Sequence, residues 1–586
     1  MQARTALAAA ALAAVTLPAI AQQVAQTQPA PAPSTPVSNN AAPSSSAPAV
    51  QRAPLSRSEG ETGVQEVTLN LPPPPPPIEY PAHARRDPWT VGAIDPAQHG
   101  LGQDPWRAAS GAFLSTLMRR METPIASRWA HIAMRQALLA KSRAPRDVHP
   151  VDWVAERAWL LLRMGEADAA RMLIAGVDTD RFTPKMTQVA VQSALANSDP
   201  PALCPIEGKI GRHEPKVRAL VEAICASLGG EPESAAAQID QARRFGRIGG
   251  IDLVLAEKVV GAGANTGRAV TVEWDPVQDL TAWRFGLATA TGMTLPDRLM
   301  RSASPQLHAF YARAPLLSAE DRLASAGVAT GLGVFSSQSL VDLYSSIYDS
   351  TDPSDLPETD AWQLRQAFVA RDDEARLAAI RRLLGNDRPQ LQQEALRALV
   401  ARAATLVQPN PDLEADAPEL ISAMLAAGYD RQAARWANAV TRMDDDHADR
   451  AWAMLALASP DAAGLDLSYG RITSFIDRDK SRGKQRSALL VAGLAGLGRI
   501  NERSAVALNQ RFGLGIGRAN NWTRMIGGAA RLGQSGTVLV LTGTGFQGET
   551  FETLPSAHLY RALMAMRRTG QDFTARMVAA EALSRT

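Results

Sequence analysis

The sequence predicts an all-α protein whose helices pair into hairpins and stack as an array, with a geometry like that of tetratricopeptide repeats (an α-solenoid). Three observations predict this fold class. Apolar residues recur at the spacing of one helix face, glycines interrupt the pattern at regular intervals, and a new helical pattern follows each interruption. Because a single hairpin of this kind cannot bury its own apolar stripe, we expect neighbouring hairpins to stack.

The segment around Gly165 illustrates the repeated pattern. Val154, Ala158 and Leu161 share one helix face before the glycine, and the apolar face resumes at Ala170 after it. Glycine suits such a turn because it adopts the left-handed conformation that ends a helix. The expected turns lie near residues 165, 198, 229, 261 and 292, and again near 428, 460, 498, 533 and 570. Their spacing of 31 to 38 residues is close to the tetratricopeptide period.

Residues 1–21 have the layout of a secretory signal peptide. A positively charged start precedes an apolar run, and a small-x-small site predicts cleavage between Ala21 and Gln22. The alternative is an uncleaved membrane anchor, but the run is shorter than the roughly 20 apolar residues that span a bilayer. We therefore expect an exported, mainly periplasmic protein with no stable membrane insertion after signal removal.

Residues 22–88 form a segment rich in Pro, Ala and Ser. The stretch 29–88 holds 15 of the 39 prolines, including the run Pro72–Pro77. Such a composition has too little apolar surface to offset the entropy of ordering, so we expect a disordered linker that contains a stiff polyproline II rod. A plain spacer and a ligand for a proline-binding domain are both open as its role.

The helical region is expected to form two lobes, 89–355 and 356–586. The segment Ser350–Thr359 contains two prolines and breaks the helical pattern between the two series of turns. On either side the pattern is regular, and Ser318 with Asp321 three residues later has the spacing of a helix capping box.

The two cysteines, Cys204 and Cys225, are disulfide candidates. In an oxidising compartment two nearby thiols usually pair, and closing a loop of about 20 residues contributes roughly 3 kcal/mol in the chain-entropy model. Two buried free thiols are the alternative. No Cys-x-x-Cys motif is present, which argues against a thiol oxidoreductase.

The charge balance argues against two classes of partner. The formal net charge is +2, from 61 basic and 59 acidic residues. A balance this even creates no field that would attract nucleic acid or an anionic membrane.

Glycine-rich runs raise the question of nucleotide binding. The strand-like run Thr537–Thr542 leads into Gly543–Gly548, which matches GxGxxG, but Pro555 follows too soon for the helix of a dinucleotide site. We expect a helix with a glycine-rich exit loop. Gly261–Arg268 and Gly513–Arg518 lack the Lys-Ser/Thr of a P-loop and are expected to be loops between helices.

No catalytic, cofactor-binding or metal-binding residue is predicted. The eight histidines show no ligand spacing on one helix, and Asp444–Asp446 is expected to cap the helix that follows it. No GxSxG elbow occurs. Glu233–Ser234 matches only two letters of the lytic transglycosylase motif. Several tryptophans lie in helical stretches, where core packing is expected over a glycan-stacking surface.

Four segments carry a resemblance to known proteins: Ser127–Trp129, Arg135–Leu139, Arg157–Glu166 and Arg576–Leu583. In these the chain resembles a group of secreted alphaproteobacterial helical-repeat proteins with no established activity. Some of them carry the label antifreeze glycopeptide polyprotein, which needs an Ala-Ala-Thr array, whereas this chain contains that tripeptide once. The resemblance implies an exported helical-repeat protein and supplies no catalytic residues.

These observations lead to one functional hypothesis and one alternative. We expect a non-catalytic scaffold of the cell envelope that needs no cofactor and binds a protein partner in the concave groove of the array. The alternative is a protein that binds peptidoglycan or another envelope polysaccharide, or a degenerate cell-wall-processing protein.

Overall fold

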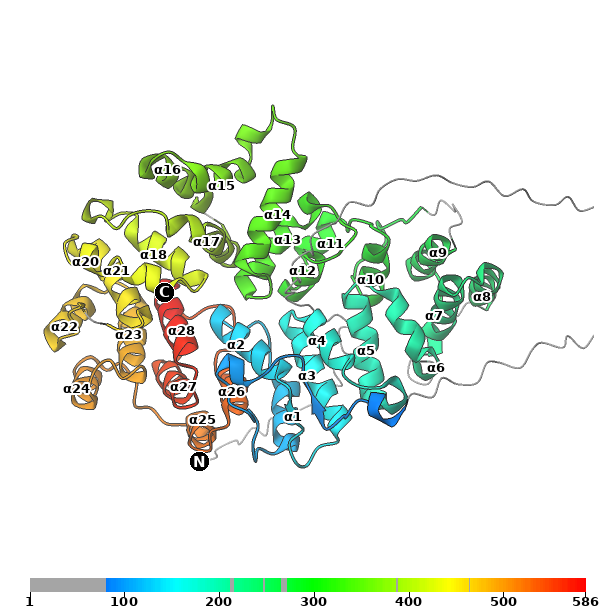
Figure 1. Cartoon of the computed structure of the whole chain (residues 1–586), viewed down its shortest axis with the longest axis horizontal. Coiled ribbons are helices and arrows are strands. Elements are labelled where there is room, and N and C mark those ends of the chain that lie inside the picture. Colours follow the sequence, from blue (N-terminus) through cyan, green and yellow to red (C-terminus); the bar gives the residue numbers. More distant parts are fainter. Residues whose placement is uncertain (1–80, 211–214, 246–247, 265–270, 386–387, 463) are drawn as a thin grey trace, which may run out of the picture. The chain divides into compact units, whose positions relative to one another are not determined.

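The computed structural model describes residues 81–210, 215–245, 248–264, 271–385, 388–462 and 464–586 (Figure 1). The predicted signal peptide, its cleavage site at Ala21 and Gln22, and nearly all of the predicted linker therefore lie outside the described residues. The described residues from Arg86 onward belong to one compact unit.

The prediction of an all-α protein is confirmed for the described residues, which are mostly helical and contain almost no strand (Figure 1). The first helices are α1 (Gly111–Arg120), α2 (Arg128–Leu139), α3 (Pro150–Met164), α4 (Ala167–Ile174), α5 (Pro184–Ala196), α6 (Glu207–Ile210), α7 (Pro215–Leu228), α8 (Pro232–Arg244), α9 (Ile251–Gly263), α10 (Ala282–Ala290), α11 (Asp297–Arg301), α12 (Pro305–Tyr311), α13 (Ala319–Leu332) and α14 (Ser337–Ser350). The others are α15 (Asp360–Val369), α16 (Asp373–Leu384), α17 (Gln390–Ala404), α18 (Ala417–Ala426), α19 (Asp430–Ala434), α20 (Ala437–Val440), α21 (Asp445–Ala458), α22 (Tyr469–Arg478), α23 (Gln485–Gly496), α24 (Glu502–Phe512), α25 (Asn521–Arg531), α26 (Ser535–Gly545), α27 (Ser556–Arg568) and α28 (Asp572–Ser584).

Short 3₁₀ helices and one small strand pair complete the secondary structure. The strands β1 (Thr90–Val91) and β2 (Ser142–Arg143) pair antiparallel. The 3₁₀ helices are η1 (Ala82–Ala84), η2 (Ala97–His99), η3 (Thr179–Arg181), η4 (Pro200–Ile206), η5 (Leu356–Glu358), η6 (Pro411–Leu413) and η7 (Arg482–Lys484). Among the described helices, none combines the length and the apolar character needed to cross a membrane.

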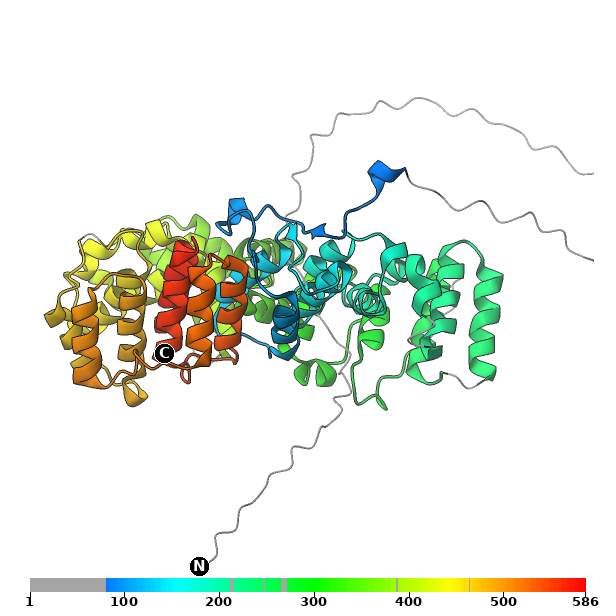
Figure 2. The same cartoon turned by 90° about the horizontal axis from the view of Figure 1, so that it is seen from below.

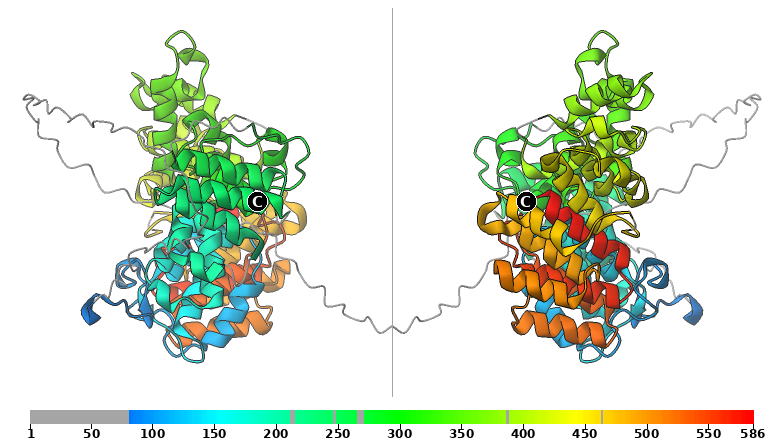
Figure 3. Two further views of the ribbon diagram at one scale, coloured as in Figure 1. Left: turned by 90° about the vertical axis from the view of Figure 1, so that its right-hand side faces the viewer. Right: turned by 90° about the vertical axis from the view of Figure 1, so that its left-hand side faces the viewer.

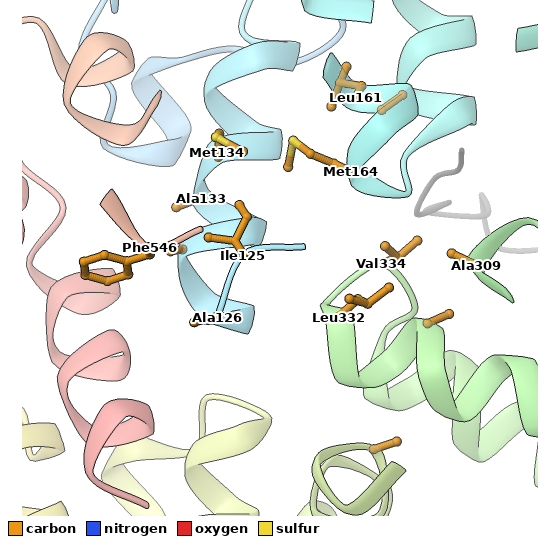
Figure 4. Packing of buried hydrophobic residues seen from close by; sticks show 14 of the residues in the cluster. Ile125, Ala126, Ala133, Met134, Leu161, Met164, Ala309, Leu332, Val334 and Phe546 are labelled. Carbon is orange, nitrogen blue, oxygen red and sulfur yellow. The ribbon is translucent and has the colours of Figure 1, made fainter. Parts of the chain in front are cut away.

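Helices that are consecutive in the chain pack against each other, as in the pairs α3–α4, α7–α8, α17–α18 and α27–α28. The first of these pairs turns at Gly165, whose φ of 105° is left-handed, as the sequence predicted. Figure 4 shows Val334, from the turn after α13, near the end of α3 at Met164. A Cβ atom at Gly165 would come within 2.6 Å of the Val334 side chain, so the glycine also permits a close approach.

Two glycine-rich segments are more helical than the sequence predicts. The turn expected near residue 261 is misplaced, because α9 continues through Gly261 and ends at Gly263. The helix expected over Thr537–Thr542 is confirmed as α26, but it continues through Gly543 to Gly545, so the expected glycine-rich exit loop begins later. Its glycines allow close packing: a Cβ at Gly543 would lie 2.7 Å from the side chain of Met134, and one at Gly545 would lie 2.4 Å from the Trp522 ring.

The first helices of the described chain pack directly against the last ones. Helix α2 contacts both α26 and α28, and Figure 1 shows α2 beside α28. Both views in Figure 3 place blue and cyan segments against orange and red ones, and Figure 2 shows the orange to red helices side by side. Figure 4 shows Phe546, from the end of α26, next to Ile125 and Ala126, which precede α2.

A buried carboxylate fixes the contact between α2 and α28. Glu581 of α28 accepts hydrogen bonds from the Ser127 hydroxyl (2.6 Å) and from the backbone N–H groups of Arg128 (2.8 Å) and Trp129 (3.3 Å). Arg585 donates to the same carboxylate over 2.8 Å. Glu581 thus satisfies N–H groups at the start of α2 that have no partner within that helix.

Helices also pack across the predicted lobe boundary near residue 355. The break is present, since α14 ends at Ser350 and α15 begins at Asp360, with η5 between them. Helix α17 packs against both α13 and α14. Residues 86–586 therefore belong to one compact unit, and the division into two lobes stays a prediction.

The core is a single cluster of buried apolar residues along the helices. The largest fully buried side chains include Trp106, Trp153 and Trp436, and Trp452 is also buried. For these tryptophans the expectation of core packing is confirmed.

Cys204 and Cys225 form a disulfide that links η4 to α7. The two cysteines are 21 residues apart, and closing a loop of this size contributes about 3 kcal/mol in the chain-entropy model.

Candidate functional site

An open groove lies among α11, α12, α13 and the start of α17. Its volume is about 1250 Å³, and Trp274 and Glu549, from loops, complete its lining. Four of its side chains are acidic and one, Arg301, is basic. The groove is the candidate functional site.

The close packing of α13 and α17 sets the width of the groove on one side. Gly331 of α13 lies against the backbone of Leu391, and a Cβ atom at this position would come within 2.2 Å of the Leu391 carbonyl oxygen. Because only a glycine fits there, the two helices cross closely. Ser325 and Val328 of α13 therefore line the groove beside Gln390 and Gln392 of α17.

The acidic side chains come from the starts of two helices and from one loop. The predicted cap of α13 is confirmed, because the Ser318 side chain accepts a hydrogen bond from the Asp321 N–H. This cap fixes the first turn of α13, which carries Glu320 and Asp321. Asp297 begins α11, and Glu549 lies in the loop between α26 and α27.

None of these four carboxylates forms an ion pair with a lysine or arginine in the described parts of the chain. Asp321 accepts a hydrogen bond from the Ser318 hydroxyl (2.8 Å), and Glu320 accepts one from Ser350 (2.8 Å). The pKa of Glu320 is lowered from its usual value, first by its own backbone N–H and then by the Ser350 hydroxyl. The groove therefore presents four carboxylates against a single guanidinium, that of Arg301.

His308 and Ser325 form a hydrogen-bonded pair in the wall of the groove. His308 Nδ1 lies 3.0 Å from Ser325 Oγ, and burial lowers the pKa of His308. A serine beside a neutral histidine resembles the nucleophile and base of a hydrolase. Ser325, however, is buried in the middle of α13, where the backbone N–H groups are committed to helix hydrogen bonds and cannot stabilise an oxyanion. The geometry favours a structural pair.

No metal centre is assembled in the described residues, where no three His, Cys, Asp or Glu side chains come together in a way that could hold an ion. Asp444 occupies the N-cap position of α21, as expected, but its side chain makes no capping hydrogen bond. Of the glycine runs, Gly261–Gly263 is the last turn of α9. Gly513–Arg518 is a loop between α24 and α25 that borders a smaller cavity of about 500 Å³.

A second polar cluster is buried where α2 meets the α3–α4 turn. His131 Nε2 lies 2.9 Å from Glu166 Oε1, and Arg135 donates to the same oxygen over 3.1 Å. Nearby, Arg313 pairs with Asp168 (3.0 Å). Because His131 is 2% exposed and Glu166 is fully buried, a ligand has no access to this cluster. It joins helices rather than binding a ligand.

Asp168, which pairs with Arg313 beside this cluster, is expected to make the stability of the fold depend on pH. Burial raises the pKa of Asp168 to about 6, above the value of about 3.9 in an unfolded chain. Between these values the folded state holds more protons than the unfolded state, so the contribution of Asp168 to stability falls as the pH rises. The measured quantity is the free energy of unfolding of the wild type minus that of the Asp168→Asn variant. We expect this difference to fall by about 2 kcal/mol between about pH 4 and pH 6. Urea unfolding of both proteins across this range measures it, and a constant difference would contradict the prediction.

The sequence predicts none of the groove residues as a site. The pattern at Ser318 and Asp321 indicates only a helix cap, and no pattern marks Glu549 or the pair of His308 and Ser325. These residues come from separate segments whose meeting depends on the packing of α11, α13 and α17.

The fold and the groove define the class of the molecule: an all-α protein with an open acidic groove. Comparison with protein-family models, with curated protein sequences and with solved structures finds no match.

Proposed function

We propose that this protein is a non-catalytic scaffold of the cell envelope, exported through its signal peptide, that binds a segment of a partner protein in the groove. The groove carries this proposal. At about 1250 Å³ it exceeds the roughly 300–1,000 Å³ of pockets for small molecules, and it is open to solvent. An opening of this kind suits a segment of polypeptide.

The packing of the helices is compatible with an array of tetratricopeptide-like hairpins. Consecutive helices pair, and each pair packs on others, as α17–α18 does on α13 and α21. Arrays of this type use their concave surfaces to bind other proteins. The disulfide between Cys204 and Cys225 supports an oxidising compartment such as the periplasm.

A polysaccharide is the second candidate ligand, and Trp274 is the observation that favours it. Its half-buried indole lines the groove and offers an aromatic surface for a sugar ring. The same indole is equally suited to a peptide side chain. The molecule that contacts the groove in the cell therefore distinguishes a protein ligand from a polysaccharide ligand.

Site-specific crosslinking in cells tests the proposal. A photo-crosslinking amino acid placed at Gln392, in the groove, should capture a discrete protein. The same amino acid at Glu502, an exposed position of α24, serves as the control and should not capture it. Capture of the same proteins from both positions would show that the groove is not the binding site, and would contradict the proposal. Sedimentation of the purified protein with cell-wall sacculi, without protein capture at Gln392, would favour the polysaccharide.

A further inference from the structure

We propose that the segment bound in the groove is basic, an extended stretch of polypeptide that carries several arginine or lysine side chains. This inference rests on the proposed function, because it names the chemistry of the protein segment that the groove would bind.

The charge of the groove is the first argument. Four carboxylates and one guanidinium line it, an excess of three negative charges. Carboxylates elsewhere in the unit are often paired with arginine, as in Arg576–Asp430 (2.8 Å), Arg397–Glu419 (3.0 Å) and Arg478–Asp449 (2.7 Å). A concave surface with one sign of charge attracts and orients ligands of the opposite sign.

The placement of the carboxylates is the second argument. They come from three different parts of the groove: the start of α11 (Asp297), the start of α13 (Glu320 and Asp321) and the loop after α26 (Glu549). They do not converge on a point that would suit a metal ion, in the parts of the chain described. Separated carboxylates match cationic groups that are spaced along a chain.

The remaining lining suits the rest of such a segment. Gln390 and Gln392 offer amide groups that donate to and accept from an extended peptide backbone. The indole of Trp274 is a favourable surface for a guanidinium. His308 adds no competing charge at neutral pH, because burial lowers its pKa.

A binding assay with defined peptides tests the inference on the full-length protein. The probes are fluorescein-labelled peptides of equal length in which alanine alternates with arginine, glutamine or glutamate. In fluorescence anisotropy we expect the arginine peptide alone to bind. We expect its affinity to fall as salt rises from about 50 to about 300 mM, because salt screens exposed charges.

Two double variants locate the binding. Asp297→Asn with Glu549→Gln removes two groove charges that take part in no capping hydrogen bond, and Glu233→Gln with Glu502→Gln removes two exposed charges outside the groove. We expect the first variant to weaken binding of the arginine peptide about tenfold or more and the second to leave it unchanged. Thermal unfolding midpoints of both variants that equal the midpoint of the wild type would show that the fold is intact.

The outcomes separate this inference from the proposed function. Equal weakening by the two variants, or no binding of the arginine peptide, overturns the inference. If the glutamine or glutamate peptide binds and the crosslinker at Gln392 captures a protein, the groove binds polypeptide of another chemistry. In that case the proposed function stands while the inference fails. If no peptide binds and Gln392 captures no protein, both fail.

Discussion

Replacing Glu581 by alanine is expected to lower the free energy of unfolding by about 4 kcal/mol, as for a buried ion pair that loses one partner. Three donors at the start of α2 would lose their acceptor, among them the Ser127 hydroxyl. Arg585, whose side chain is 2% exposed, would lose its closest carboxylate. The change would therefore loosen the contact between α2 and α28.

Chemical denaturation followed by tryptophan fluorescence measures this effect. The matched control is Glu222→Ala, which breaks a more exposed pair with Arg218 one turn away on α7. Such surface pairs contribute less than about 1 kcal/mol, so the control should be close to the wild type. Equal shifts of the unfolding midpoint in the two variants would show that Glu581 has no special role.

Replacing Gly331 by alanine is expected to cost about 3 kcal/mol and to weaken ligand binding in the groove. The new methyl group would lie 2.2 Å from the carbonyl oxygen of Leu391, which is backbone and cannot rotate away. Helices α13 and α17 would have to separate, as happens when a packed interface is overfilled. Since both helices line the groove, the same displacement should weaken binding of the arginine peptide.

Gly527→Ala is the control for this prediction. Gly527 lies inside α25, and a Cβ atom there meets no other atom within 4 Å. Alanine is favoured over glycine in a helix interior, so this variant should be stabilised by about 0.5–1 kcal/mol. If both glycine variants were stabilised, the close crossing of α13 and α17 would be refuted.

Local features of the fold could be predicted from the sequence because their causes are local. The turn at Gly165 and the cap at Ser318 depend on residues within a few positions of each other. The run Thr537–Thr542 has the composition of a strand, yet it forms part of α26, because burial among neighbouring helices outweighs intrinsic preference.

The packing of distant segments could not be predicted in this way. Nothing near Ser127 indicates that its hydroxyl bonds to Glu581, 454 residues away. The groove has the same origin, since its acidic residues lie on α11, on α13 and in the loop after α26. A single sequence predicts helices and caps, but it does not predict which helices meet.

The bond between Ser127 and Glu581 also bears on the timing of synthesis. At about 5–20 residues per second, a ribosome needs about 20–90 s to pass from one partner to the other, 454 residues later. During this interval the apolar surface of α2 that later contacts α26 and α28 has no native neighbour from those helices. Helix α2 therefore completes its native packing only after α28 has been made.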